Sequence, residues 1–178
     1  MIIILAGLPG TGKSTLGREL AQRIGATILD KDPIRAALFP PSDIEYSTSQ
    51  DDFVVAIMMQ VAGYLLHRGR SRPIILDGRP FSRRYQLEQV IRFSDQMEEP
   101  WLILECVCSD ETARARLEQS ADAGVHPAIN RDFNLYLRVK QHFEEITFRK
   151  TVIDTDQPLE NCIEKSIAAL RRADTNRT

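Results

Sequence analysis

A short apolar run, Ile2 to Leu5, leads directly into a loop that reads GLPGTGKS over residues 7–14. The loop matches the pattern G-x-x-x-x-G-K-[ST] at every fixed position. Glycines let successive backbone N–H groups curl around a β-phosphate and form a nest of partial positive charge. Because an apolar strand pattern precedes the loop and an amphipathic helical pattern follows it, a chance glycine turn is the weaker interpretation. The chain is therefore predicted to bind a nucleoside triphosphate.

The residues of this loop have separate expected roles. Lys13 is expected to reach the β- and γ-phosphates and so to be catalytic, while Ser14 offers its hydroxyl to Mg²⁺. A helix that begins at Lys13 would point the positive end of its dipole at the same phosphates. ATP and Mg²⁺ are thus the expected cofactors. The expected ATP-binding residues here are Gly7, Leu8, Pro9, Gly10, Thr11, Gly12, Lys13, Ser14 and Thr15.

Length and composition limit the classes of protein to consider. A chain of 178 residues is long enough for one α/β domain, expected to span 1–178, and too short for a motor ATPase with a separate helical lid domain. Three cysteines without C-x-x-C spacing favour reduced core residues and a cytoplasmic protein. No basic leader and no apolar run of about 18 residues is present, so we expect no export and no membrane partner.

Strand and helix patterns alternate along the whole sequence, which predicts crossover connections and an α/β fold. We expect a parallel sheet of about five strands with helices on both faces. Ligands bind at the carboxyl ends of such strands, so the polar residues there are the candidates for function. A long, mostly apolar helical segment between Gln50 and Gly69 is expected to cover the site of the second substrate. The predicted strands are 2–5, 27–29, 73–76, 101–107 and 151–153.

Two carboxylates and an arginine follow the second predicted strand, namely Asp30, Asp32 and Arg35. Phosphoryl transfer to an alcohol needs alignment, charge neutralisation and a carboxylate within reach of the hydroxyl. We therefore expect Asp32 to be the catalytic base and, together with Arg35, to contact the acceptor. Alternatively, Asp32 caps the next helix, with Pro33 at its first position. Asp30 is expected either to hold Mg²⁺ through water or to solvate the strand end.

The third predicted strand ends on Asp77, and an arginine follows shortly after. An apolar strand that closes on a carboxylate is typical of the element that orders Mg²⁺ beside Ser14, so Asp77 is an expected metal ligand. A cap on the turn at Gly78 is the alternative role. Arg79 is expected to contact an anionic or polyhydroxylated acceptor.

Three arginines flank a loop of small residues after the fourth predicted strand, namely Arg114, Arg116 and Arg131. A kinase must exclude water from the γ-phosphate, and a hinged lid that carries an arginine does this while offsetting charge. We expect a lid at approximately 114–131, with Arg131 at the acceptor. Arg114 and Arg116 are both candidates for ATP binding. Because they lie two residues apart on a helix, at most one should face the nucleotide, and Arg116 is favoured as the catalytic one.

The loop after the fifth predicted strand is expected to hold the adenine ring. Thr155 and Pro158 lie in this loop, where they would pack on the purine opposite a lid arginine. A plain helix N-terminus is the alternative interpretation, and the two interpretations are compatible.

With these residues in place, the chain resembles the small P-loop kinases of the shikimate, gluconate and adenylate kinase type. It resembles still more the group that contains polynucleotide 5′-kinase domains, zeta toxins and bacterial predicted kinases. In that group Gly7–Ser14 is similar to the Walker A loop, Asp77 to the Walker B position, and Asp32 with Arg35 to a D-x-x-R pair whose aspartate activates the acceptor hydroxyl. The resemblance covers nearly the whole chain. It implies a three-layer P-loop NTPase fold with strand order 2-3-1-4-5 and a small lid.

We therefore expect an ATP-dependent phosphotransferase that transfers the γ-phosphate to a hydroxyl of a small metabolite, with ATP and a hydroxylated acceptor as partners. The alternative is a polynucleotide 5′-hydroxyl kinase with Arg35 and Arg79 on backbone phosphates. The net charge of −2 makes nucleic acid the less favoured acceptor. A GTPase-type switch and a non-kinase nucleotide-binding regulator rank lower, because the sequence lacks D-x-x-G and N-K-x-D patterns and keeps the residues for catalysis. The oligomeric state is left open.

Overall fold

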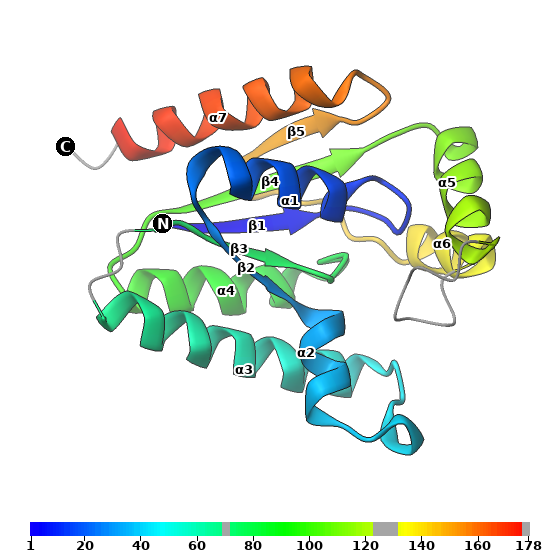
Figure 1. The fold of residues 1–178 in the computed structure, drawn as a ribbon, viewed down its shortest axis with the longest axis horizontal. Coiled ribbons are helices and arrows are strands. Elements are labelled where there is room, and N and C mark those ends of the chain that lie inside the picture. Colours follow the sequence, from blue (N-terminus) through cyan, green and yellow to red (C-terminus); the bar gives the residue numbers. More distant parts are fainter. Residues whose placement is uncertain (69–71, 123–131, 176–178) are drawn as a thin grey trace.

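A computed structural model describes residues 1–68, 72–122 and 132–175 of the chain. In these residues five strands form one parallel sheet in the order β2-β3-β1-β4-β5 (Figure 1). The predicted fold class and strand order are confirmed, and every predicted strand is within one residue of the observed one at both ends. The strands are β1 Ile2–Ala6, β2 Thr27–Asp30, β3 Ile74–Asp77, β4 Trp101–Val107 and β5 Lys150–Asp154.

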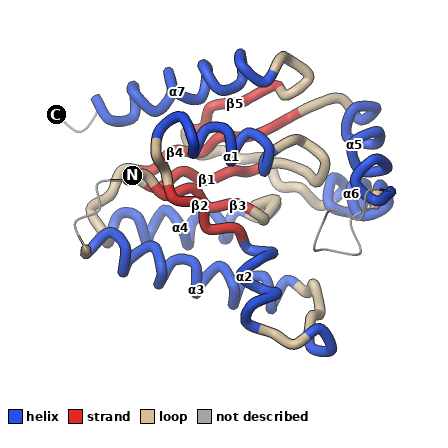
Figure 2. Tube along the Cα trace, in the orientation of Figure 1, coloured by secondary structure: helices blue, strands red, loops and turns tan. Residues whose placement is uncertain are grey.

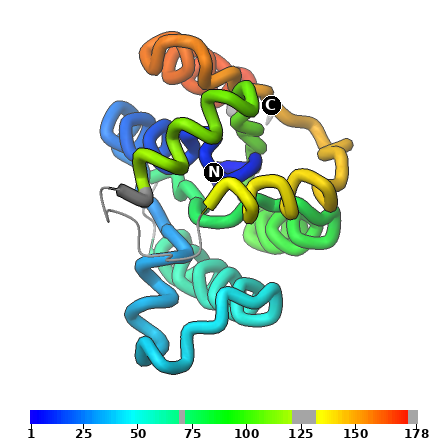
Figure 3. The backbone as a smooth tube through the Cα atoms, turned by 90° about the vertical axis from the view of Figure 1, so that its right-hand side faces the viewer, coloured from blue at the N-terminus to red at the C-terminus, as the bar shows by residue number. Residues whose placement is uncertain are grey.

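Helices cover both faces of the sheet (Figure 2). Helices α1 and α7 pack on one face, and α3 and α4 pack on the other. Helices α5 and α6 lie at the end of the sheet toward which the strands point, in front of the strand ends in Figure 3. The helices are α1 Lys13–Ile24, α2 Lys31–Leu38, α3 Thr48–His67, α4 Arg84–Gln96, α5 Asp110–Asp122, α6 Phe133–Gln141 and α7 Leu159–Thr175, with a 3₁₀ turn at Pro41–Asp43.

The central strand β1 is completely buried, with every residue from Ile2 to Ala6 at 0% exposure. Ile2 and Ile4 face the layer of α3 and α4, whereas Ile3 and Leu5 face the layer of α1 and α7. A strand that is covered on both faces needs apolar residues at every position, and this explains the unbroken apolar run in the sequence. The buried strand fixes the position of the loop that follows it.

Strands β2 and β3 lie on one side of β1 and strands β4 and β5 on the other, so the strand order switches sides at β1. Such a switch in strand order opens a crevice at the carboxyl ends of the strands. The loops that contain the candidate site residues begin at this edge. Residues 123–131, which include Arg131 and much of the expected lid, lie outside the described part of the chain. Among the described helices, none has the length and apolar character needed to cross a membrane.

Candidate active site

The glycine loop connects β1 to α1 in a conformation that requires glycine. Gly7 has a φ of 132° and Gly10 a φ of 80°. A Cβ on Gly7 would lie 2.2 Å from the carbonyl oxygen of Cys106, and a Cβ on Gly10 would lie 2.9 Å from that of Ala113. The loop therefore packs too closely on β4 and α5 for any side chain at these two positions. Its backbone is held open at the mouth of the crevice.

Lys13 is the first residue of α1, and its side chain folds back over this loop. Its Nζ donates hydrogen bonds to the carbonyl oxygens of Gly7 at 2.8 Å and Leu8 at 2.7 Å. Ser14 follows at the N-terminus of the same helix, where the positive end of the helix dipole lies. The expected helix start at Lys13 is thus observed, and it brings an ammonium group and a hydroxyl to the loop.

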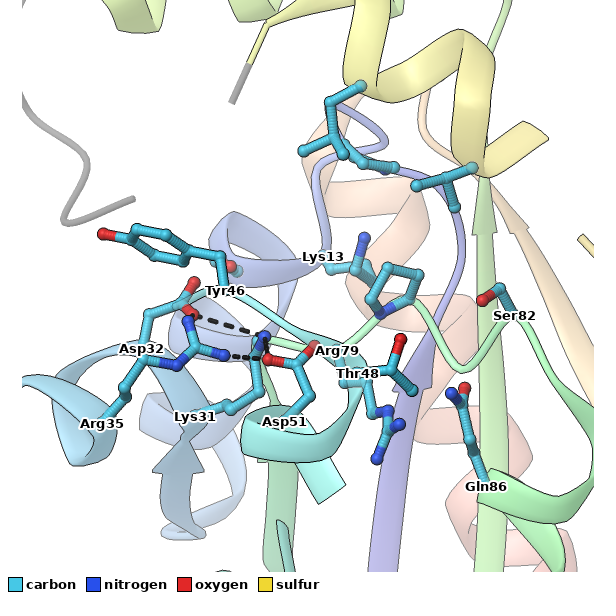
Figure 4. Close-up of a pocket in the computed structure, with 16 residues that line it drawn as sticks. Lys13, Lys31, Asp32, Arg35, Tyr46, Thr48, Asp51, Arg79, Ser82 and Gln86 are labelled. Carbon is cyan, nitrogen blue, oxygen red and sulfur yellow. Dashed lines mark hydrogen bonds and ion pairs between the residues drawn. The ribbon is translucent and has the colours of Figure 1, made fainter. Parts of the chain in front are cut away.

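Two adjoining cavities open at this edge of the sheet, and they share Lys13, Ser14 and Asp32. The larger cavity, called the nucleotide cleft below, has a volume of about 560 Å³. The smaller, called the acceptor cavity below, has a volume of about 260 Å³ (Figure 4). The cleft is lined by Gly10, Gly12, Lys13, Ser14, Thr15, Leu16, Arg18, Asp30, Asp32, Pro33, Arg116, Leu117, Gln119, Ser120, Thr155, Gln157, Leu159 and Cys162. The acceptor cavity is lined by Pro9, Lys13, Ser14, Lys31, Asp32, Arg35, Tyr46, Thr48, Asp51, Gly78, Arg79, Pro80, Ser82, Gln86, Leu135 and Val139.

Arg116 lies in the nucleotide cleft, and its guanidinium is hydrogen-bonded to the loop after β5. Its Nη1 donates to Oγ1 of Thr155 at 3.0 Å and its Nη2 to the Thr155 carbonyl at 2.8 Å. Thr155 Oγ1 in turn donates to the carbonyl of Thr11 at 3.0 Å. Arg116, Thr155 and the glycine loop therefore form one continuous wall.

Arg114 takes a different direction from Arg116. Its side chain is exposed, and its guanidinium lies 4.0 Å from the centroid of the Phe133 ring on α6. Arg116 thus lies in the cleft, whereas Arg114 lies outside it, where α5 contacts α6. Pro158 is not among the residues that line the cleft, although its neighbours Gln157 and Leu159 are.

A ring of alternating charges forms one wall of the acceptor cavity (Figure 4). Oδ1 of Asp32 accepts from Nη1 of Arg35 at 3.1 Å and lies 3.5 Å from Nζ of Lys31. Lys31 also donates to Oδ1 of Asp51 at 2.8 Å, and Arg35 contacts the same oxygen. Arg35 is only 2% exposed and lies 5.0 Å from the centroid of the Tyr46 ring. The network holds the Asp32 carboxylate at the boundary between the two cavities.

The N-terminal cap of α2 is Asp30, whose carboxylate accepts the backbone N–H of Asp32 at 3.1 Å. The alternative interpretation of Asp32 as the cap is therefore wrong. Pro33 is the third residue of the helix rather than the first, which is permitted because the N–H groups of the first turn have no partner within the helix. Asp32 is thus not occupied with capping.

Asp30 and Asp77 bring two carboxylates together at the ends of β2 and β3. Burial, followed by the charge of Asp77, raises the pKa of Asp30 to about 6. Asp77 is buried, and its Oδ1 has no hydrogen-bond partner among the described residues. Hard oxygen donors of this kind suit Mg²⁺, which is bound by few protein groups and several phosphate or water oxygens. Ser14, Asp77 and Asp30 therefore fit the expected metal ion.

Arg79, two residues after the end of β3, lines the acceptor cavity and is 2% exposed. Its Nη2 donates to Oδ1 of Asp52 at 2.5 Å, and the Tyr85 hydroxyl donates to the other oxygen of Asp52 at 3.0 Å. Its Nη1 has no hydrogen-bond partner in the described part of the chain. Arg35 and Arg79 thus both reach the cavity, but each is paired with a carboxylate.

Sequence reasoning missed several residues of the cavity wall, most of all Lys31 and Asp51. Burial, together with the charges of Arg35 and Arg79, lowers the pKa of Lys31 to about 8, although Asp32 opposes this shift. The two adjacent carboxylates Asp51 and Asp52, at the start of a long apolar helix, were the available signal. Other residues without an expected role are Tyr46, Thr48, Ser82, Gln86, Leu135 and Val139.

Helix α6 connects the acceptor cavity to α5 and hence to the nucleotide cleft. The hydroxyl of Tyr136 donates to Oδ1 of Asp110 at 2.6 Å, and Nζ of Lys140 donates to both oxygens of Asp110 at 2.6 and 2.7 Å. From the same helix, Leu135 and Val139 reach the acceptor cavity. Since α5 contains Arg116, the two helices link the walls of both cavities.

A glycine loop after the central strand of a 2-3-1-4-5 sheet, with a lysine and a serine at the start of the next helix, is the arrangement of a nucleotide-binding P-loop. The chain belongs to the AAA domain family, whose profile matches residues 2–146. It is also similar to shikimate kinase from Mycobacterium ulcerans (strain Agy99), with 59% identity over 29 residues. That similarity spans only 16% of this chain and 16% of the relative.

Solved structures with this fold include several kinases. A gluconokinase from Sinorhizobium meliloti 1021 has a TM-score of 0.71 and 16% identity, covering 98% of this chain and 94% of its own. The Mycobacterium tuberculosis APS kinase CysC, in complex with AMPPNP and APS, has a TM-score of 0.70 and 16% identity over 96% of both chains. Chaetomium thermophilum Kti12 in complex with ADP-AlF3 has a TM-score of 0.69 and 16% identity, covering 95% and 98%. At such identities the likeness establishes the shared fold alone.

Proposed function

We propose that the chain is an ATP-dependent phosphotransferase that transfers the γ-phosphate to a hydroxyl group of a small metabolite. One observation carries this proposal: the two adjoining cavities share Lys13, Ser14 and Asp32. A cleft for the nucleotide and a cavity for the acceptor meet at the groups that phosphoryl transfer needs, namely a phosphate-binding cation, a ligand for Mg²⁺ and a carboxylate. The fold shared with a gluconokinase and an APS kinase supports the same conclusion.

In this proposal the triphosphate lies along the glycine loop, with Lys13 at the β- and γ-phosphates and Arg116 offsetting charge from the α5 side. Thr155 lines the cleft in the loop after β5, the loop that we assign to the adenine ring. Bound Mg²⁺, for which Ser14, Asp77 and Asp30 are the protein groups, supplies charge neutralisation at the phosphates. These contacts align the γ-phosphate with the acceptor cavity.

Asp32 is the proposed base. Its hydrogen bond from Arg35 uses Oδ1, so Oδ2 is available to an acceptor hydroxyl. As the acceptor oxygen forms a bond to the γ-phosphorus, the bond between that phosphorus and the β,γ-bridging oxygen breaks and ADP leaves. The hydroxyl proton passes to Asp32. Arg35 and Lys31 pair with the Asp32 carboxylate and hold it at this position.

A polynucleotide 5′-hydroxyl kinase is less well supported. That function would use Arg35 and Arg79 to neutralise backbone phosphates, yet both side chains are 2% exposed and paired with carboxylates. A buried and already paired guanidinium gains little from a further anion. The proposal therefore favours a small acceptor over a nucleic acid.

A coupled ADP-release assay tests the proposed function. Wild-type protein is screened with Mg-ATP against sugars, amino alcohols, antibiotics and 5′-hydroxyl oligonucleotides, and the Lys13→Ala variant serves as the blank. We expect ADP release that depends on one class of acceptor and is abolished by Lys13→Ala, because the positive charge at the phosphates is then lost. Acceptor-dependent turnover that persists in a folded Lys13→Ala protein would contradict the assignment.

A further inference from the structure

The charges on the wall of the acceptor cavity compensate one another. Lys31 and Arg35 are paired with Asp32 and Asp51. Arg79, which also lines the cavity, is paired with Asp52, a residue outside the lining. Among the described residues, Lys13 is the remaining cation of the lining, and the proposed function assigns it to the phosphates of ATP. In the described part of the wall, each of the other cations is therefore offset by a paired carboxylate.

This balance opposes a charged acceptor. An ionic group placed in a buried, internally paired network must lose its hydration without gaining an unpaired counterion. An anion would lie beside the carboxylates of Asp32 and Asp51 as well as beside a cation, and a cation would lie beside Lys31 and Arg35 as well as beside a carboxylate. An uncharged acceptor meets no such repulsion.

The same wall is well supplied with hydrogen-bonding groups. Within the described residues, the ion pairs of Asp32 and Asp51 all use Oδ1, which leaves Oδ2 of each carboxylate to accept from a ligand. Arg79 contributes a donor, Nη1, that has no partner in the described chain. Carboxylate oxygens accept and guanidinium groups donate, whereas a hydroxyl group can do both. Several hydroxyl groups on one molecule suit such a wall.

The opposite wall of the cavity is apolar. Leu135 and Val139 lie four residues apart on α6, and both line the cavity. Figure 4 shows α6, in yellow, across the cavity from the charged cluster. A ligand between these walls has hydroxyl groups along one side and a C–H surface on the other. A volume of about 260 Å³ is below the roughly 300–1,000 Å³ of pockets for drug-sized ligands.

We infer that the acceptor is a compact, uncharged polyhydroxylated ring, a cyclic sugar or a cyclitol in chemical class, with its hydroxyl groups toward the Asp32 and Asp51 wall and its C–H face on α6. This inference rests on the proposed function and narrows the hydroxyl compound to one class. It names Asp51 as a residue that determines specificity by offsetting the charges of Lys31 and Arg35.

Matched sets of acceptors test this inference. Each neutral pyranose or cyclitol is assayed beside a counterpart with a carboxylate, a phosphate or an amine in place of one hydroxyl, and kcat/KM is measured for each. We expect kcat/KM to be about tenfold or more higher for the neutral compound, a factor that corresponds to about 1.4 kcal/mol. Comparison of pyranoses with cyclitols distinguishes the two ring types. Higher kcat/KM for the charged counterparts would overturn the inference.

Two variants test whether the charged wall with Asp51 causes the preference for uncharged acceptors. Asp51→Asn removes one carboxylate charge and leaves Lys31 and Arg35 in excess, so the ratio of kcat/KM for the acid to that for the neutral compound should rise. Asp95→Asn, an identical change at an exposed position on α4, should leave this ratio at the wild-type value. An unchanged ratio in Asp51→Asn would contradict the role given to Asp51.

Thermal stabilisation by the same compounds, measured without ATP, distinguishes this inference from the proposed function. Bound ligand raises Tm whether or not phosphate is transferred. If neutral rings stabilise the wild type, and stabilise Asp51→Asn less, while ADP never exceeds the Lys13→Ala blank, the inference holds and the proposed function fails. If only charged compounds bind and are phosphorylated, the proposed function holds and the inference fails. If no neutral ring binds or reacts, the inference is overturned.

Discussion

Asp30 and Asp77 are register partners on the adjacent strands β2 and β3, so two carboxylates end side by side under the glycine loop. Burial and the charge of Asp77 raise the pKa of Asp30 to about 6. Ionisation of Asp30 is therefore unfavourable until a cation neutralises the site. The same Asp30 caps α2, so the proposed metal site and the start of the helix that contains Asp32 share one side chain.

Substitution Asp30→Asn separates charge from capping, because asparagine is as good a cap as aspartate. The native pKa of Asp30 is raised above the unfolded value of about 3.9, so its favourable contribution is complete below pH 4 and is lost as pH rises through 6. Without Mg²⁺, the Tm of the wild type should therefore fall relative to Asp30→Asn between about pH 4 and 6. Differential scanning calorimetry across this range measures the difference, and parallel curves would contradict it.

Mg²⁺ should offset this loss of Tm in the wild type. The wild type should gain more Tm from Mg-ATP at pH 7 than Asp30→Asn does, because the ion relieves the repulsion between Asp30 and Asp77. Asp95→Asn, on the exposed side of α4, should gain as much as the wild type. Equal gains in all three proteins would remove Asp30 from the metal site.

Asp32→Asn tests the proposed base. Because Asp30 caps α2 and Asp51 remains a partner for Lys31 and Arg35, the variant should fold. Turnover should fall by roughly 10²-fold or more, the usual scale for a positioned base, while the Kd for ATP changes by only a few fold. Steady-state rates and ATP titration measure the two quantities. Loss of ATP binding as well would give Asp32 a metal-binding or structural role instead.

The fold and the nucleotide side of the site could be predicted because their signals are local. The glycine spacing, the apolar run of β1 and the carboxylate that ends β3 can each be recognised within a few residues. The cap of α2 was not predicted correctly, because only Asp32 was considered for it with Pro33 as the first helical residue, whereas Asp30 is the cap and proline is tolerated throughout the first turn.

The acceptor side could not be predicted to the same extent, because its contacts join distant segments. Lys31 is adjacent to Asp32 in sequence, but its second partner, Asp51, comes from α3. Arg79 pairs with Asp52 across 27 positions of the chain. Hydrophobic periodicity places such residues on helices and strands but contains no signal for which charges pair. The long helix from 50 to 69 was expected to cover this site, and its first turn does line the cavity.

Gly7→Ala should destabilise the protein far more than Gly25→Ala does. Both glycines have positive φ, which costs an alanine about 1 kcal/mol. A Cβ on Gly25 would have no atom within 4 Å, whereas one on Gly7 would lie 2.2 Å from the Cys106 carbonyl oxygen. We expect Gly7→Ala to lose an additional 1–3 kcal/mol or so from this overlap. Urea unfolding of the two variants gives the comparison, and equal losses would show that the loop can move away from β4.

Tyr136→Phe tests whether α6 shapes the acceptor cavity through its bond to α5. The substitution removes the hydroxyl that donates to Asp110 and keeps the ring packed on Phe133, with Lys140 still on Asp110. Loss of this hydrogen bond should appear in part as looser positioning of Leu135 and Val139. We expect KM for the acceptor to rise several fold while KM for ATP stays nearly constant. Tyr64→Phe, at an exposed tyrosine of α3, is the matched control and should change neither. Equal increases in both KM values would mean that the Tyr136–Asp110 hydrogen bond stabilises the packing of α5 against α6 and does not act on the acceptor cavity alone.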